Sequence, residues 1–160
     1  FTVYGPWGRP DMAPMIFIKS ILERKKIKIF NNGNMRRDFT YIDDVVEGIA
    51  RCCSKPANPN GEFDPFNPEN ASSFAPYRIF NIGNNQPIQL LEFIEILEET
   101  LGLKAIKNFL PMQPGDVEET FANSDLLNEW VGFTPSTRIE IGIKKFADWY
   151  KNYHSLNINF

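Results

Sequence analysis

The chain has 160 residues, of which 42% are hydrophobic and 23% charged, which is ordinary for a soluble globular protein and enough for one domain with a real core. Its net charge of −3 argues against a nucleic-acid partner, and no apolar run is long enough to cross a membrane. We therefore expect neither a nucleic-acid partner nor a membrane-spanning segment. Residues 1–37 nevertheless contain eight Lys and Arg against two Asp and Glu, which suits either a small anionic ligand or a solvated helix face.

The first third of the chain predicts two strand–helix pairs. A strand over residues 1–4 leads through a loop to a helix that Pro14 opens and Lys25-Lys26 closes. Short strands are expected at residues 27–30 and 39–42, on either side of an Asn-rich turn. Asp43 and Asp44 then open a second helix, whose apolar stripe consists of Val46, Ile49, Ala50 and Cys53.

Residues 54–77 are rich in Pro, Asn and Ser and predict a long surface loop. Strands are expected at residues 77–82 and 105–110, with a helix between them from Leu90 to Leu101 that Gly102 stops. Ser124 starts a short helix that Gly132 stops. A capping box, Thr137-x-x-Glu140, opens the last helix.

This alternation predicts an α/β fold in a single domain over residues 1–160. The strands are too few and too short for a complete doubly wound sheet, and the chain begins within a strand, so we expect part of a larger protein. Adjacent Cys52 and Cys53 cannot form a disulfide without severe distortion and lack a metal-ligand spacing, so reduced thiols in a cytoplasmic protein are expected.

The sequence contains no glycine-rich dinucleotide fingerprint, and none of its tyrosines has a lysine four residues later. No metal site or nucleophile–base arrangement suggests itself either. We therefore expect the chain alone to lack catalytic residues, residues that bind a cofactor's phosphates, and activity.

Three segments carry the functional signal. They are residues 2–13 (TVYGPWGRPDMA), residues 35–48 (MRRDFTYIDDVVEG) and residues 112–117 (MQPGDV), with Phe80-Asn-Ile-Gly between the second and third. In this order they resemble the C-terminal half of bacterial UDP-glucuronate 4-epimerases, which are extended short-chain dehydrogenase/reductases. The resemblance implies that 1–160 is the substrate-binding domain and that a Rossmann domain binding NAD precedes it.

The resemblance assigns the nucleotide's charged and polar parts to three residues. Arg37 would hold the diphosphate, since a guanidinium is a planar fork of donors that matches phosphate oxygens. Asp116 would accept the ribose hydroxyls, although a turn-forming role after Pro-Gly fits it as well. Gln113 stands where the superfamily often has arginine, so it can hydrogen-bond phosphate without neutralising it. The alternative for Arg37 is a surface pair with Asp38.

Uracil would bind near Met12 and along residues 28–30, although Phe30 fits a buried core position equally well. Arg9 and Thr2 would decide the substrate, because a uronate carries a carboxylate where a hexose carries a hydroxyl. The plainer alternatives are local carbonyl hydrogen bonds for Arg9 and strand propensity for Thr2.

The implied activity is an NAD-dependent isomerase that interconverts UDP-glucuronate and UDP-galacturonate at C4, with a full-length homodimer and a UDP-sugar as partner. Another nucleotide-sugar epimerase, a dehydratase or a decarboxylase on the same scaffold remains an alternative. So does a sugar-nucleotide binding module without chemistry.

Overall fold

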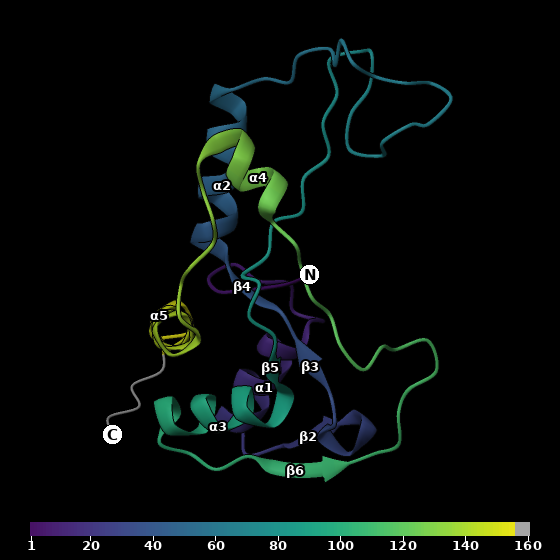
Figure 1. Cartoon of the computed structure of the whole chain (residues 1–160). Helices are drawn as coiled ribbons and strands as arrows, with labels where there is room; N and C mark the ends of the chain where they lie inside the picture. The colour runs from purple at the N-terminus through teal and green to yellow at the C-terminus, as the bar shows by residue number, and fades with distance from the viewer. Residues whose placement is uncertain (156–160) are drawn as a thin grey trace.

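The computed structural model describes residues 1–155, shown in Figure 1. Its strands are β1 (Thr2–Tyr4), β2 (Lys26–Ile29), β3 (Arg36–Arg37), β4 (Phe39–Tyr41), β5 (Ile88–Gln89) and β6 (Ile106–Phe109). Its helices are α1 (Ala13–Leu22), α2 (Ile42–Ser54), α3 (Leu90–Leu101), α4 (Asp125–Val131) and α5 (Ile139–Tyr153), with a 3₁₀ turn η1 (Phe30–Gly33). The α/β class is therefore as predicted.

The strands pair two by two. β1 lies parallel to β4 and β2 parallel to β6, while β3 is antiparallel to β5. The two parallel pairs join segments far apart in sequence, since Lys26 is opposite Ile106 and Ile29 is opposite Phe109. The β2–β6 pair therefore brings the segment after β6 beside the segment that follows β2.

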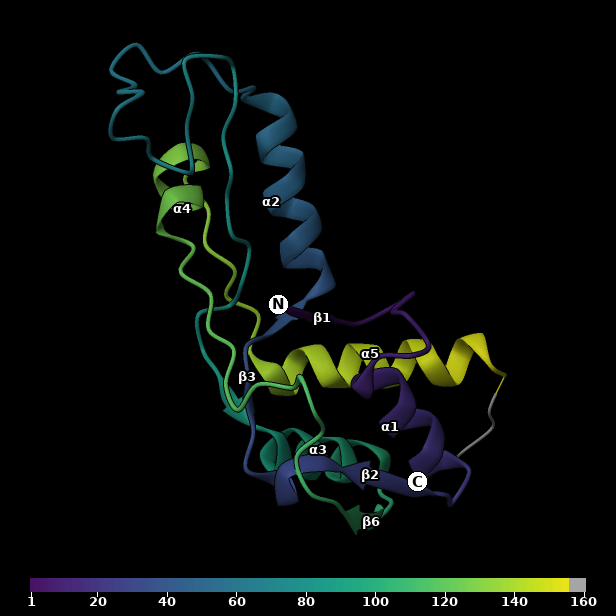
Figure 2. The same ribbon diagram turned by 90° about the vertical axis from the view of Figure 1, so that its right-hand side faces the viewer.

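The core lies where α1, α3 and α5 pack around β1, β2 and β4 (Figures 1 and 2). Phe39 stacks on Phe93 with ring centroids 4.3 Å apart, and Tyr4 meets Phe93 edge to face. Gly142 permits this packing, because a Cβ there would overlap the Tyr4 hydroxyl. Burial is also the main reason that the pKa of Tyr4 is raised well above its ordinary value.

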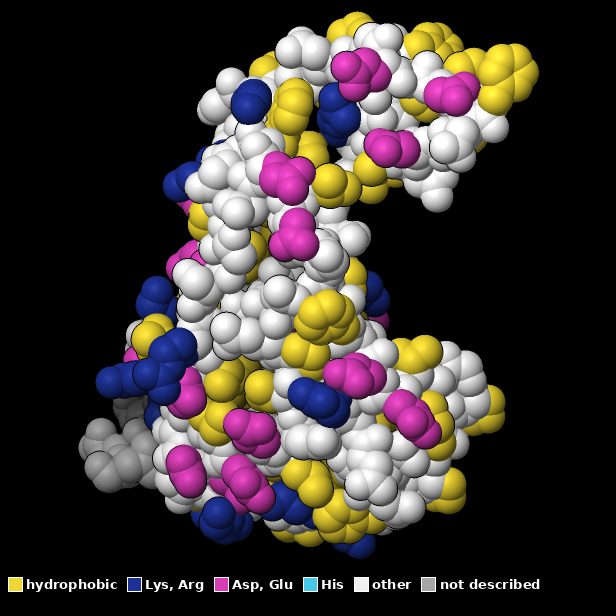
Figure 3. All heavy atoms as spheres, viewed as in Figure 1, with side chains coloured by type: hydrophobic (Ala, Val, Ile, Leu, Met, Phe, Trp, Pro, Cys, Tyr) yellow, Lys and Arg dark blue, Asp and Glu magenta, His cyan; other side chains and the backbone are white. Residues whose placement is uncertain are grey.

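An arm extends from this body, formed by α2, α4 and residues 55–87, which we call the long loop (Figure 2). Trp130 of α4 contacts the loop at its first residue, Lys55, and at Arg78. The Lys55 ammonium lies 4.5 Å and the Arg78 guanidinium 5.2 Å from the indole ring, while the indole N–H donates to the Lys55 carbonyl at 3.0 Å. Figure 3 shows the loop as a projection that bears apolar and acidic side chains.

Several local predictions are confirmed. α3 spans the predicted residues, and Gly102 ends it in the left-handed conformation with a φ of 63°. Gly132 ends α4 in the same way, with a φ of 62°. Asp43 and Asp44 lie in the first turn of α2, as their interaction with the helix dipole requires.

Three local predictions are wrong. Helix α1 ends at Leu22, so Lys25 and Lys26 do not close it; the left-handed Arg24 turns the chain and Lys26 enters β2. Residues 77–82 form no strand. Side chains of other segments bind the backbone just beyond them instead, with Ser124 exchanging hydrogen bonds with Gly83.

The third wrong prediction is the capping box. Arg138 is the N-cap of α5 and makes no side-chain cap hydrogen bond. The Thr137 amide instead donates to the Asp44 carboxylate at 2.9 Å, and Glu140 pairs with Arg138. The apolar stripe of α2 is partly exposed to solvent, since the exposed fractions of Val46 and Ile49 are 54% and 51%.

Candidate functional site

One cavity of about 580 Å³ brings together residues from the three motif segments. It lies among α1, β2, β3 and residues 111–118, which we call the Gln113 turn and which Figure 1 shows as the green loop rising from β6. Six of the seven predicted site residues line it: Thr2, Met12, Phe30, Arg37, Gln113 and Asp116. Arg9 is not among the lining residues.

The alternation of β2 sets one wall of the cavity. Ile27 and Ile29 are fully buried against the core, so Lys26 and Lys28 point to the opposite face and line the cavity. Phe30 follows at the start of η1, packs partly buried against the core and also lines the cavity. Its place at the edge of the core is compatible with either sequence interpretation, and its contact with uracil stays a prediction.

Arg37 lies at the centre of the site, and its side chain is 14% exposed. Its Nη1 donates to the Arg36 carbonyl at 2.9 Å and to the Glu118 carbonyl at 3.1 Å. Its Nη2 donates to the Val117 carbonyl at 2.7 Å and to the Asp116 carboxylate at 2.8 Å. Four of the five N–H donors that an arginine has are thus bonded to the Gln113 turn or the adjacent backbone.

The alternative pair of Arg37 with Asp38 does not form. Asp38 is fully buried, and its Oδ2 accepts the amides of Asn85 and Ala122, each at 3.0 Å. Neighbouring residues on a short strand point to opposite sides, which separates the two side chains. Arg37 faces the cavity and Asp38 faces the interior.

Asp116 forms part of a turn and also lines the cavity. Its amide donates to the Gln113 carbonyl at 3.1 Å, and Gly115 has a φ of 81°, so the segment is a true turn. Its carboxylate nevertheless points at the cavity and accepts from Arg37 as well as from the Val117 amide at 2.9 Å. The predicted diphosphate ligand and the predicted ribose ligand therefore bind each other.

Arg9 sits outside the cavity, with its side chain 74% exposed. It binds Asp11 through Nε at 3.1 Å and through a second contact from Nη2. The hydrogen bond from Arg9 is the main reason that the pKa of Asp11 lies below its ordinary value. Asp11 itself lines the cavity, so Arg9 is connected to the site only through its ion pair with Asp11.

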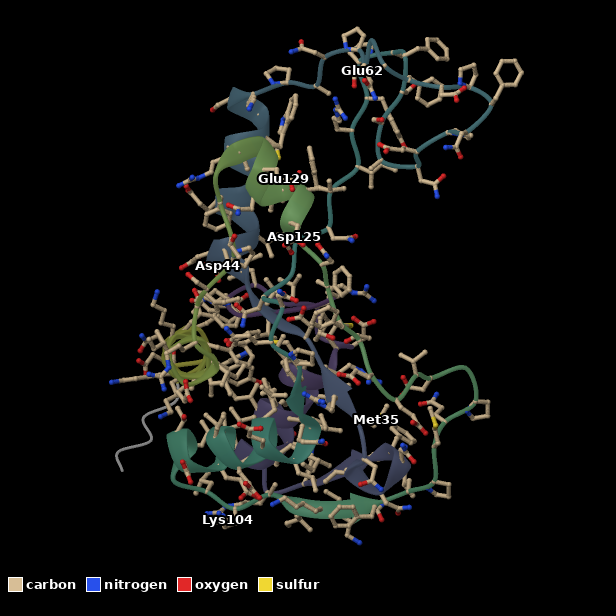
Figure 4. The ribbon with its side chains drawn as sticks, in the orientation of Figure 1. Met35, Asp44, Glu62, Lys104, Asp125 and Glu129 are labelled. Atoms are coloured by element: carbon tan, nitrogen blue, oxygen red, sulfur yellow. The ribbon has the colours of Figure 1, made fainter. Side chains whose placement is uncertain are left out.

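Several lining residues escaped the sequence analysis. Met35, labelled in Figure 4 between η1 and β3, is buried at the cavity wall. Asp11 and Lys26 were also missed, whereas Lys28 belongs to the segment 28–30 that was predicted to bind uracil. The alternating Lys-Ile-Lys-Ile pattern could have placed both lysines on one exposed face.

A second hollow, of about 720 Å³, lies between α2 and α4. Its cations are bonded to the helix end, since Arg51 donates to the Gly132 carbonyl at 3.0 Å and Lys55 to the Trp130 carbonyl at 2.6 Å. These contacts satisfy the carbonyls at the C-terminal end of α4, so the presence of Arg51 and Lys55 in this hollow is explained without a ligand. Within residues 1–155, no cluster of three metal-binding side chains occurs, and no helix is both long and apolar enough to cross a membrane.

Residues 1–83 match the NAD dependent epimerase/dehydratase family, and the chain belongs to that family. Protein CapI of Staphylococcus aureus is 53% identical over 154 residues, which cover 96% of this chain and 46% of that protein. A probable UDP-glucuronate 4-epimerase of Rhizobium meliloti is 47% identical over 155 residues, covering 96% and 46% respectively. The chain thus spans about half the length of these relatives.

The fold also matches that of solved structures. The UDP-glucuronic acid 4-epimerase of Bacillus cereus, in complex with UDP-glucuronic acid and NAD, superposes with a TM-score of 0.79 at 33% identity, over 96% of this chain and 44% of that one. The predicted family resemblance and fold class are therefore confirmed.

Proposed function

We propose that the chain is the UDP-sugar-binding portion of an NAD-dependent epimerase that interconverts UDP-glucuronate and UDP-galacturonate at C4. The observation that carries this proposal is the convergence of residues 2, 12, 37, 113 and 116 on one cavity from segments spread over most of the chain. The named relatives and the Bacillus cereus complex support the choice of a uronate.

In the proposed complex the nucleotide stays fixed while the sugar turns over. The guanidinium of Arg37 and the amide of Gln113 bind the diphosphate, and the carboxylate of Asp116 accepts ribose hydroxyls. Met12 and Phe30 provide the apolar wall for uracil, and Thr2 lies on the sugar side. NAD would supply the chemistry by removing hydride from C4 and returning it to the other face.

The sequence has neither a glycine-rich phosphate loop nor a Tyr-x-x-x-Lys pair. We therefore assign cofactor binding and proton transfer to residues outside these 160. The chain's own contribution is to bind UDP and to orient the sugar.

Arg9 would contact the uronate carboxylate only after leaving Asp11. Its exposure makes that exchange inexpensive, because solvent screens an ion pair at the surface. The same observation favours a second candidate substrate, a neutral UDP-hexose, since the cavity as it stands does not include Arg9. The two substrates differ at the carboxylate alone.

Calorimetric titration of the chain with UDP, UDP-glucose and UDP-glucuronate tests the proposal. We expect UDP to bind, and UDP-glucuronate to bind more tightly than UDP-glucose in the wild type but not in Arg9→Ala. Equal binding of both sugars would favour the neutral hexose. A folded chain that binds no UDP would refute the assigned site.

A further inference from the structure

Trp7 adopts a backbone conformation that bulky residues rarely have, with a φ of 62°. The Gly8 amide donates to the Gly5 carbonyl at 3.2 Å, which closes a β-turn. Pro6 is the second residue of this turn and Trp7 the third, and a proline followed by a positive φ is the mark of a type II turn. Glycine is favoured in the third place, so the contacts of a tryptophan there must offset a cost in free energy. Such strain gathers at functional sites.

The contacts of Trp7 are with aromatic rings of α5. Its ring centroid lies 5.5 Å from that of Trp149 and 5.0 Å from that of Tyr153. Trp149 stacks on Tyr153 at 5.3 Å and also on Phe146, which is fully buried in the core. Aromatic pairs at these separations attract each other beyond the area that they bury. The turn is therefore docked on α5, along which the segment after β1 passes in Figure 2, although 74% of the Trp7 surface stays exposed.

The docked turn leads directly into the loop that carries Arg9. The Met12 amide donates to the Arg9 carbonyl at 3.2 Å, which closes a second turn. The Met12 carbonyl then accepts the Ile16 amide at 3.0 Å, so α1 holds this second turn at its far end. Arg9 thus lies between one end that α1 fixes and another that the Trp7 ring fixes on α5.

Fixing the backbone at Arg9 matters because its side chain has to change partner. It pairs with Asp11 outside the cavity, and it would have to turn inward to meet a sugar carboxylate. If the turn moved freely, binding would also have to order the backbone, which costs conformational entropy. The nucleotide end of the cavity does not depend on this turn, because Arg37 and Asp116 are held by β3 and the Gln113 turn.

We propose that Trp7 is a positioning residue that sets the selectivity of the site for a uronate, by docking its turn on α5 and so placing Arg9 beside the cavity. This inference rests on the proposed function, in which Arg9 binds the sugar carboxylate. It gives the aromatic face of α5 a part in substrate choice, although Trp149 and Tyr153 do not line the cavity. Glycine in place of Trp7 would relax the turn but remove the ring that docks it.

The test compares Trp7→Gly, Trp7→Phe and Tyr153→Ala with Phe66→Ala. Trp7→Gly removes both the ring and the strain, Trp7→Phe keeps a smaller ring, and Tyr153→Ala removes a ring partner without altering the turn. Phe66 is the matched control, because it is an aromatic residue of the long loop that is 96% exposed. Each variant is titrated with UDP, UDP-glucose and UDP-glucuronate, and circular dichroism verifies that it is folded.

We expect the ratio of the UDP-glucuronate affinity to the UDP-glucose affinity to fall about fivefold or more in Trp7→Gly, toward the ratio of Arg9→Ala. Trp7→Phe and Tyr153→Ala should lie between Trp7→Gly and the wild type, and Phe66→Ala should match the wild type. The affinity for UDP, which lacks the carboxylate, should stay the same throughout. In the Arg9→Ala background, Trp7→Gly should leave the ratio unchanged, which a general loss of stability would not explain.

A ratio in Trp7→Gly that equals that of the wild type would overturn the positioning role and leave the proposed function standing. Equal weakening of all three ligands would overturn it too, because the turn would then support the whole site rather than the choice of sugar. Tyr153→Ala carries the same comparison where Trp7→Gly does not fold. A wild type that binds UDP-glucuronate no better than UDP-glucose, or that binds none of the ligands, would overturn both proposals.

Discussion

Replacing Arg37 by Met removes the link between β3 and the Gln113 turn while keeping an unbranched, flexible stem. Four hydrogen bonds are lost, three of them to carbonyls and one to Asp116. A hydrogen bond to a charged group contributes about 1.5–3 kcal/mol when buried, but the freed carbonyls and carboxylate at this rim can be rehydrated. We therefore expect a net loss of about 2 kcal/mol, or a fall in Tm of about 4–8 °C for a domain of this size.

The neighbouring arginine provides the control. Arg36 is 47% exposed, and its side chain makes one hydrogen bond to the Pro87 carbonyl at 3.0 Å and a 3.6 Å contact with Glu119. Arg36→Met should cost less than about 0.5 kcal/mol in stability. Differential scanning calorimetry measures both variants, and hydrogen exchange reports whether the amides of the Gln113 turn lose protection.

Titration with UDP below both melting temperatures separates the two roles of Arg37. A ligand role predicts at least a tenfold loss of affinity in Arg37→Met and little change in Arg36→Met. Equal Tm values for the two variants would refute the structural reasoning. Unchanged UDP affinity despite a lowered Tm would refute Arg37 as a ligand.

Two further predictions concern stability away from the cavity. Burial by itself would raise the pKa of Glu98, but hydrogen bonds from Lys104 (labelled in Figure 4) and Lys107 and the Ala105 amide outweigh it, so the pKa lies below its ordinary value. These hydrogen bonds stabilise the fold fully at pH values above the pKa of about 4.3 that Glu98 has in the unfolded chain. The stabilisation is lost as the pH falls through the lower pKa that Glu98 has in the folded protein. Urea unfolding should therefore show Glu98→Gln about 1–2 kcal/mol less stable than the wild type at neutral pH, and a gap that does not narrow as the pH falls below the unfolded pKa would contradict this. Trp130→Ala should loosen the long loop at Lys55 and Arg78 and speed its proteolysis about tenfold, because cation–π contacts of about 0.5–1 kcal/mol each and one hydrogen bond are lost, whereas equal cleavage of Trp130→Ala and wild type would show that other contacts hold the loop.

Elements whose signals are local were predictable from the sequence. The apolar spacing of α3 predicts the helix, and the glycines after α3 and α4 predict where each helix ends to within a few residues. Both signals are local because the hydrogen bonds within a helix link residues four apart. Residues 77–82 have the composition of a strand, but they form only an isolated bridge, between Arg78 and Ser72, and the amides just after them bind side chains far away in the sequence. Ser124, Thr40 and Asp38 satisfy the amides of residues 83–85, and no local pattern announces these partners.

The sequence by itself determined the family motifs, the positive excess of residues 1–37 and six of the residues that line the cavity. Only the tertiary structure decided which of those charges are neutralised. Arg37 and Asp116 are 79 positions apart and meet because β2 pairs with β6, while Lys26 and Lys28 line the same cavity without an ion pair to any carboxylate within residues 1–155. The physical reason is that Coulomb and hydrogen-bond energies depend on distance in space, which the order of residues fixes only within a helix turn or a strand.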